Sequence, residues 1–370
     1  MFFGSLFLCT FVWICHNTNV AHHIAMKRSS ILIIYTGGTI GMKTDEATGA
    51  LVPFDFSGIY EEFPSLKRLN VDIEVFTIKP PIDSSNVSVE NWVDMARIIR
   101  DNYYKYDGFV ILHGTDTMSY SAAALSFMLE NLAKPVIFTG SQIPIGILRT
   151  DGRENLITAI EIAGARNEDG APIVPEVALY FQNKLMRGNR TTKFSAEALN
   201  AFASFNYTAL ADVGVNIQYN TSAIASYAPD FSDEFRISES MCSDVIVIKL
   251  FPGIRPTTLR AMLIDSGVKG VVLETYGAGN APTTEWFVDL IKEAVERGVV
   301  VVNVSQCKDG AVQMHLYETG LALQEAGVVS GHDMTIEAAV AKLMYVLGKN
   351  LPLSEMLSLM RRPLRGEFTM

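Results

Sequence analysis

The 370-residue sequence has few cysteines and few histidines, and it lacks the usual metal-binding patterns. Its four cysteines, Cys9, Cys15, Cys242 and Cys307, are widely spaced and show no C-x-x-C metal or redox spacing. This usage favours a reducing compartment. The six histidines include no H-E-x-x-H pattern, so the sequence offers no metal site.

Basic side chains are also in the minority, because 40 acidic residues outnumber 30 basic ones and give a formal net charge of −10. No stripe of lysine and arginine is present that would neutralise phosphates, so nucleic acids and anionic membranes are poor candidate partners. The sequence has no low-complexity tract and no repeat period. Its length suits two globular domains better than one.

A long apolar run is absent except at the N-terminus, where residues 1–15 are apolar and aromatic. No lysine or arginine precedes this run, so the charged start of a secretory signal is missing. The run is also shorter than the ~20 residues that cross a bilayer as a helix. Residues 1–25 therefore have two interpretations: an extension from a start site placed upstream of Met26, or a degenerate secretory signal.

Residues 31–35 form an apolar, β-branched run that leads into a turn containing Thr36, Gly37, Gly38 and Thr39. Such a run predicts a buried parallel strand, and open α/β sheets bind ligands at the carboxyl ends of their strands. The two glycines permit a sharp turn and a close approach to a ligand. On its own this turn is also typical of an ordinary β-turn, and it does not match the dinucleotide-binding spacing G-x-G-x-x-G.

A second turn of the same kind follows the strand-like residues 108–111. Residues 112–118, LHGTDTM, place Thr115 and Asp116 just before an alanine-rich helical pattern. Free amide groups and the helix dipole favour an anion there, either a substrate carboxylate or a developing oxyanion. Asp116 is also compatible with a simple helix cap. We expect the two threonine-bearing turns to belong to one site.

Taken together, the motifs resemble those of the L-asparaginases, most of all the cytoplasmic-type (type I) bacterial enzymes. The resemblance rests on five segments, which are YTGGTIG at 35–41, DGFVILHGTDTM at 107–118, GSQIP at 140–144, RGNRTTK at 187–193 and YGAGNAP at 276–282. It covers nearly everything from about Met26 to the C-terminus. It implies an α/β fold with a larger N-terminal domain, whose mostly parallel sheet is flanked by helices, and a smaller C-terminal α/β domain.

The alternation of strand and helix patterns itself predicts a parallel sheet with right-handed crossovers. Between about residues 216 and 243 the periodicity fades into Ser, Thr, Asn, Asp and Pro, as in a connection between domains. We therefore expect an N-terminal domain at 26–215, a linker at 216–242 and a C-terminal domain at 243–370.

The resemblance implies hydrolysis of L-asparagine to aspartate and ammonia through an acyl-enzyme on Thr39, without a cofactor. It assigns Thr115, Asp116 and Lys193 to a proton relay, and it places Asp83, Ser84, Ser141 and Asn280 around the substrate. A threonine hydroxyl needs an adjacent base, and a desolvated lysine is able to act as one near neutral pH.

From the residues alone, two of these assignments stay open. Thr36 and Thr39 flank the same Gly-Gly turn, so sequence chemistry does not separate them as nucleophiles. Residues 83–86, Asp-Ser-Ser-Asn, are equally typical of an N-cap for the helix that follows.

Two regions depart from the family pattern. Residues 44–50 correspond to the lid, and many members carry a catalytic tyrosine where this chain has Ala50 and Leu51; the next tyrosine is Tyr60. Some type I members bind an effector beside the relay lysine. Thr192 and Cys307 match that pattern, but Glu274 stands where an arginine is expected, which argues against effector control.

The same motifs fit two further functions, a non-catalytic amino-acid-binding homologue and an amidase that prefers glutamine or another amide. One methylene is worth only ~1–3 kcal/mol, so the sequence does not separate asparagine from glutamine. In the family, the region of Asn280 reaches a neighbouring subunit, which implies a homo-oligomer, either a dimer or a tetramer. The resemblance implies a cytoplasmic location, whereas a true signal at 1–25 would imply export.

The two interpretations of residues 1–25 make different predictions for the native protein. If the start site is misplaced, the native chain begins at Met26. N-terminal sequencing of the protein from its natural source checks this, and a mature end before Met26 would exclude the misplaced start.

Overall fold

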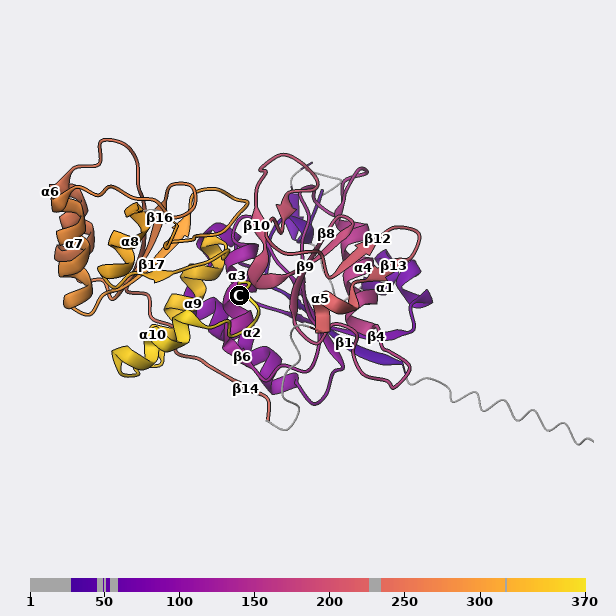
Figure 1. The fold of residues 1–370 in the computed structure, drawn as a ribbon. Coiled ribbons are helices and arrows are strands. Elements are labelled where there is room, and N and C mark those ends of the chain that lie inside the picture. Colours follow the sequence, from indigo (N-terminus) through magenta and orange to yellow (C-terminus); the bar gives the residue numbers. More distant parts are fainter. Residues whose placement is uncertain (1–27, 45–48, 50, 54–58, 226–233, 317) are drawn as a thin grey trace, which may run out of the picture.

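The computed structural model describes residues 28–44, 49, 51–53, 59–225, 234–316 and 318–370. The chain forms two α/β domains that lie side by side, and the N-terminal one is the larger (Figure 1). An eight-stranded sheet organises the N-terminal domain and a four-stranded sheet the C-terminal domain. The expected fold class is therefore confirmed. Residues 1–25 and the lid position Ala50 lie outside the described residues.

The large sheet has the strand order β13-β12-β9-β8-β7-β5-β1-β4. Its parallel part consists of β4 (Val71–Thr77), β1 (Ser29–Tyr35), β5 (Gly108–Leu112), β7 (Val136–Thr139) and β8 (Val177–Phe181). The remaining strands, β9 (Lys184–Arg187), β12 (Ala211–Val213) and β13 (Ile217–Tyr219), are antiparallel to their neighbours. The ends of β1 and β5 that carry the two threonine turns therefore meet at one edge of the sheet.

Strand β1 is buried on both faces, which explains its uninterrupted apolar sequence. Ile31 and Ile33 face the core that contains α4 (Gly152–Gly164). Leu32 and Ile34 face the opposite core, which contains α2 (Val89–Asn102) and α3 (Met118–Met128). The edge strand β4, by contrast, alternates between more and less exposed side chains, as its sequence predicts.

The expectation that residues 83–86 cap the following helix is wrong. Asp83 accepts a hydrogen bond from the Ser85 N–H and begins the separate 3₁₀ helix Ser84–Asn86. Helix α2 is instead capped at Ser88, whose N–H donates to the Asn91 side chain. The short 3₁₀ helix absorbs the turn-forming residues, so the α-helix begins later than they indicate.

The smaller sheet is entirely parallel, and its two inner strands are buried. Its strands are β15 (Val245–Lys249), β16 (Gly270–Thr275), β17 (Val300–Ser305) and β18 (Val329–Ser330). Its helices are α6 (Pro256–Arg260), continued by a π-helical turn Ala261–Asp265, then α7 (Glu285–Glu296), α8 (Glu318–Glu325), α9 (Ile336–Gly348) and α10 (Leu353–Arg361).

Several short elements connect these layers. They are β2 (Met42–Thr44), β3 (Leu51–Pro53), α1 (Ile59–Glu62), β6 (Leu129–Glu130), β10 (Thr192–Lys193), β11 (Phe202–Ala203), α5 (Thr221–Ala225), β14 (Arg236–Ile237) and the 3₁₀ helices Thr39–Gly41, Pro64–Arg68 and Gly188–Arg190. β13 belongs to the large sheet, so elements of the N-terminal domain run beyond the boundary expected at 215. Strands of three residues show too little periodicity to be seen in the sequence.

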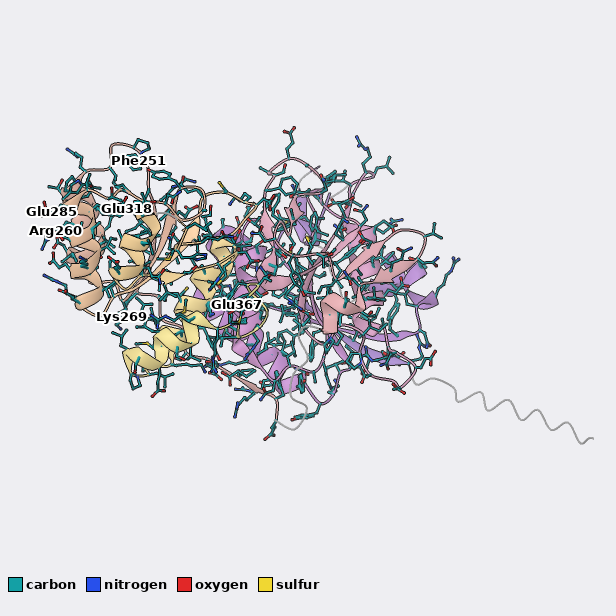
Figure 2. All side chains as sticks on the ribbon, in the orientation of Figure 1. Phe251, Arg260, Lys269, Glu285, Glu318 and Glu367 are labelled. Atoms are coloured by element: carbon teal, nitrogen blue, oxygen red, sulfur yellow. The ribbon has the colours of Figure 1, made fainter. Side chains whose placement is uncertain are left out.

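The two domains share an apolar core across α3 and α9, in which the rings of Phe127 and Tyr345 lie 5.9 Å apart. Figure 2 shows Glu367 where the two domains meet, and its carboxylate forms a fully buried ion pair with Lys342, at 2.7 Å. No helix of the described residues has both the length and the apolar character needed to cross a bilayer.

A buried hydrogen-bond chain ties the end of β5 to α2 and α3. The indole N–H of Trp92 donates to Ser121 Oγ at 2.9 Å, and Ser121 lies 2.9 Å from His113 Nε2. His113 Nδ1 lies 2.7 Å from the carbonyl oxygen of Gly114. Because a carbonyl only accepts, Nδ1 carries the proton and Nε2 accepts from Ser121. In this neutral tautomer the Trp92 N–H, the Ser121 hydroxyl and both ring nitrogens of His113 each have a hydrogen-bond partner.

Burial lowers the pKa of His113 to about 4. The unfolded chain therefore binds more protons than the folded one between about pH 6.5 and pH 4. The contribution of neutral His113 to the free energy of unfolding is complete above that range and is lost as the pH falls through it. We expect His113 to remove about 2 kcal/mol of folding free energy between pH 7 and pH 5. Denaturant unfolding at both pH values checks this. The same measurement on His113→Asn shows how much the other titrating groups contribute, because they are common to both proteins. If the free energy of unfolding fell equally with pH in both proteins, the role of His113 would be contradicted.

Candidate active site

The turn after β1 approaches the turn after β5 so closely that two glycine backbones meet. Gly38 has a φ of 87°, and a Cβ built on it would lie 2.4 Å from the Cα of Gly114. No side chain fits in that space, so only glycine permits the contact. Thr39, which begins a 3₁₀ helix, and Thr115 each follow one of these glycines. The contact therefore joins both threonine turns in one place.

The geometry distinguishes the two threonines of the first turn. The hydroxyl of Thr36 donates to the carbonyl of Leu112 at 3.0 Å, and the Thr36 N–H donates to the same oxygen at 3.0 Å. Thr36 is 2% exposed and its hydroxyl is committed to holding the two turns together. Thr39 is half-buried, so its side chain retains access to solvent.

Thr115, Asp116 and Lys193 form one hydrogen-bonded cluster. The ammonium group of Lys193 donates to Thr115 Oγ1 at 2.8 Å and to Asp116 Oδ1 at 2.7 Å. The Lys193 side chain is 16% exposed and that of Asp116 64%, so the pair lies at the rim of a site. Lys193 reaches it from β10, which pairs with β11.

Gln142 completes this cluster, although the sequence does not single it out. The hydroxyl of Thr115 donates to Gln142 Oε1 at 3.1 Å. The amide nitrogen of Gln142 in turn donates to the carbonyls of Ala196 and Ala198, at 3.3 and 3.2 Å. Thr115 therefore accepts from Lys193 and directs its own proton to Gln142. The sequence does contain a feature that points to Gln142, because this residue directly follows Ser141 in the GSQIP motif.

Ser84 approaches the same glycine from another side. A Cβ on Gly114 would lie 2.5 Å from Ser84 Oγ, and Thr117 Oγ1 donates to the carbonyl of Ser84 at 2.6 Å. Asp83 beside it is exposed, and a hydrogen bond from the Ser85 N–H lowers the pKa of the Asp83 carboxyl. A charged carboxylate and a buried hydroxyl thus lie next to the threonine turns.

Two of the expected site residues have surroundings of a different kind. Ser141 is 1% exposed, and its hydroxyl faces Gly152 at the start of α4, with no hydrogen-bond partner among the described residues. Asn280 lies in the C-terminal domain, where its side-chain oxygen accepts from Thr319 at 2.8 Å. None of the hydrogen bonds found for Asn280 in the described part of the chain reaches Thr115 or Lys193.

The region behind Lys193 is acidic. Thr192 donates to the buried carboxylate of Glu337 at 2.6 Å. Burial, together with the charges of Glu337 and Glu274, raises the pKa of Tyr120 to about 12. Cys307 is exposed and not in a disulfide. Tyr60, the tyrosine nearest in sequence after the lid, accepts a hydrogen bond from the Ile73 N–H, in β4.

Within the described residues, no group of three or more His, Cys, Asp or Glu side chains is arranged to hold a metal ion. The groups gathered around the two threonine turns are hydroxyls, the Lys193 ammonium, carboxylates and backbone amides. Such groups suit nucleophilic attack with proton transfer.

Comparison with known proteins agrees with this geometry. The family model "Asparaginase, N-terminal" matches residues 30–225, and "Glutaminase/Asparaginase C-terminal domain" matches residues 244–360. L-asparaginase 1 of Escherichia coli is 43% identical over 93% of this chain and 99% of its own. The crystal structure of L-asparaginase I from Vibrio cholerae superposes with a TM-score of 0.84 at 43% identity, over 93% of this chain and 100% of that one.

A relative with a different name is nearly as similar. The human 60 kDa lysophospholipase is 42% identical over 92% of this chain, which spans 61% of that protein. The first family model includes the segments that carry Thr39, Thr115 and Lys193, and the two models together extend over both domains. The chain belongs to the asparaginase family.

Proposed function

We propose that this protein hydrolyses L-asparagine to L-aspartate and ammonia through an acyl-enzyme formed on Thr39. The observation that carries the proposal is the contact of Gly38 with Gly114, which sets the turn of Thr39 against the Thr115–Lys193 cluster. The relatives named as L-asparaginases give the substrate class.

In the first step, the hydroxyl oxygen of Thr39 attacks the side-chain amide carbon of asparagine. A threonine hydroxyl is a poor nucleophile, so its proton must pass to a base. Thr115 would relay the proton to Lys193 in its neutral form, which requires the Thr115 hydroxyl to turn away from Gln142. Each such transfer typically contributes ~10²- to 10⁴-fold.

The C–N bond then breaks, ammonia leaves with the relayed proton, and water hydrolyses the ester on Thr39. Backbone amides near Thr115 and Ser141 would stabilise the oxyanion of both steps, at ~3–4 kcal/mol for each donor. This use of Ser141 involves its main chain, which is compatible with a side chain packed toward Gly152.

The substrate is held as a free amino acid. Asp116 has a mostly exposed carboxylate and would pair with the substrate ammonium, while Ser84 and Asp83 would bind its carboxylate end. Asn280 would contribute from a neighbouring subunit of a homo-oligomer. Large exposed apolar side chains on the C-terminal domain, such as Val247 and Phe251, are compatible with association. A cytoplasmic location fits the free thiols of Cys242 and Cys307.

Two alternatives remain distinct from this proposal. An amidase that prefers glutamine or another amide would use the same threonines, and the name of the human relative shows that substrates differ between similar chains. A non-catalytic amino-acid-binding protein is favoured by the lack of a tyrosine at Ala50 and Leu51.

The chain beginning at Met26 is expected to release ammonia from L-asparagine. Thr39→Ala is expected to lower kcat by ~10⁴-fold or more, the scale of losses on removing an activated nucleophile. Thr36→Val removes the other hydroxyl of the same turn and is expected to retain most of kcat, at some cost in stability. Ammonia release and circular dichroism on the three proteins test this.

The outcomes separate the alternatives. Ammonia release from glutamine with the higher kcat/KM would assign the enzyme to glutamine, and binding of asparagine without ammonia release would favour the non-catalytic protein. Full activity of a folded Thr39→Ala variant, or loss of activity in Thr36→Val alone, would overturn the assignment of the nucleophile.

A further inference from the structure

Residues Leu364, Arg365, Gly366, Glu367, Phe368 and Thr369 form a tight bend, here called the 364–369 hook, in which Glu367 and Phe368 are buried and Thr369 is exposed. Its shape depends on Glu367, which is 0% exposed. The Glu367 carboxylate accepts from the N–H groups of Leu364 and Arg365, at 3.0 and 2.7 Å, and pairs with the ammonium of Lys342. The Phe368 ring stacks on His332 at 4.5 Å. The hook is therefore anchored to the C-terminal domain through Lys342 and His332.

The hook accepts hydrogen bonds from the 3₁₀ helix Gly188–Arg190 of the other domain. Asn189 Nδ2 donates to the carbonyl of Arg365 at 3.0 Å. Arg190 Nε donates to the carbonyl of Gly366 at 2.9 Å, and Arg190 Nη2 donates to Thr369 Oγ1 at 2.7 Å. Asn189 and Arg190 are 1% and 2% exposed, so the donors of these bonds are buried and the loss of an acceptor is costly.

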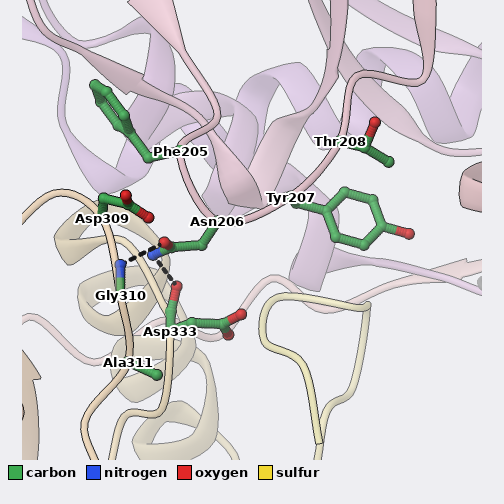
Figure 3. A pocket seen from close by; sticks show the side chains of 8 residues that line it. All are labelled: Phe205, Asn206, Tyr207, Thr208, Asp309, Gly310, Ala311 and Asp333. Atoms are coloured by element: carbon green, nitrogen blue, oxygen red, sulfur yellow. Dashed lines mark hydrogen bonds between the residues drawn. The ribbon is translucent and has the colours of Figure 1, made fainter.

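Asp333 secures the same arginine from the start of α9. Its carboxylate pairs with Arg190 at 2.9 Å and accepts from the Thr369 N–H at 2.8 Å. Figure 3 shows Asn206 reaching across a hollow between the domains, where it donates to the Asp333 carbonyl and accepts from the Gly310 N–H. The ring of Tyr207 lies 4.9 Å from the Arg190 guanidinium. Hook and turn therefore form one tied junction.

This junction lies three residues before Lys193. Strand β10, Thr192–Lys193, is two residues long and pairs with the equally short β11, so it has little rigidity of its own. The residues on its N-terminal side are held by the hook, at Asn189 and Arg190, and Thr192 is held by its bond to Glu337. These contacts come from the C-terminal domain, whereas on the other side of Lys193 the N–H groups of Phe194 and Ser195 donate to the Ala201 carbonyl of their own N-terminal domain.

We propose that the 364–369 hook is a positioning element for Lys193, because it holds the turn that delivers the Lys193 ammonium to Thr115 and Asp116. The inference rests on the proposed role of Lys193 in the proton relay. It assigns a function to Gly366 and Thr369, which act through Arg190 and touch no substrate. A misplacement of about 1 Å far from the chemistry is able to cost ~10²-fold in rate.

Gly366 provides the sharpest test. Its φ is 70°, and a Cβ there would lie 2.3 Å from Arg187 Nη1. Arg187 has no room to yield, because it is 2% exposed, pairs with Glu176 at 2.6 Å and donates to the Ala223 carbonyl. Gly366→Ala must therefore shift the hook or the turn. Gly267 is a matched control, since its φ is 72° and a Cβ there meets nothing within 4 Å.

Two measurements on the Met26 chain compare Gly366→Ala with Gly267→Ala. We expect Gly366→Ala to lower kcat for ammonia release at least tenfold while KM changes less than twofold, and Gly267→Ala to leave both near the parent values. We also expect amide hydrogen exchange in a peptide covering residues 188–195 to quicken in Gly366→Ala and not in Gly267→Ala. If the hook only contributed to global stability, Gly366→Ala would not lower kcat selectively. It would also not quicken amide exchange in the 188–195 peptide alone.

A second pair removes one contact without touching the backbone. Thr369→Val removes the hydroxyl that accepts from Arg190 Nη2 and is expected to lower kcat severalfold. Thr369→Ser keeps a hydroxyl at this position, so we expect its kcat to be close to that of the parent. Equal kcat in the two glycine variants, or unchanged exchange at 188–195, would overturn the positioning role. If the parent chain released no ammonia, the proposed function would fail, and the exchange measurement would still decide whether the hook holds the turn.

Discussion

The site depends on one close contact between backbones, that of Gly38 with Gly114. A Cβ at either position would meet main-chain or buried side-chain atoms, so two glycines are needed for two strand ends to carry threonines into the same space. Thr36 closes the same contact with a hydroxyl and an N–H on one carbonyl of β5. The parallel sheet places the two threonine-bearing turns at the same edge, and the glycine contact brings these turns close together.

A second constraint is that the relay lysine is delivered from a weak element. The residues proposed for catalysis all lie in the N-terminal domain, yet β10 is too short to hold Lys193 by strand pairing. The bonds that fix Arg190 and Thr192, just before Lys193, come from Gly366, Thr369 and Glu337, beyond the domain boundary. Buried charges at that boundary are paired, as at Arg190 with Asp333, which avoids the cost of an isolated ion.

Much of this architecture can be predicted from local patterns. The apolar run at 31–35 and the turn glycines predict a strand buried on both faces and a ligand site at its end. This prediction is possible because strand and turn formation depend on residues that are close in sequence. The structure adds what depends on distant partners. Thr36 differs from Thr39 through a carbonyl 76 residues away. Gln142 becomes part of the cluster through Thr115, and Asp83 turns out to begin a 3₁₀ helix and not α2. No periodicity in the sequence reports such long-range contacts.

The hook also bears on how this protein can be divided. The domain that carries Thr39, Thr115 and Lys193 has its own large sheet and, on one face of it, its own apolar core, so it resembles an independently folding domain. Its turn at Asn189 and Arg190, however, takes its hydrogen-bond acceptors from carbonyls more than 170 positions further along the chain. A gene fragment that encodes this module alone would inherit the reactive groups while leaving a buried guanidinium without its acceptors, so the two halves are one unit for engineering.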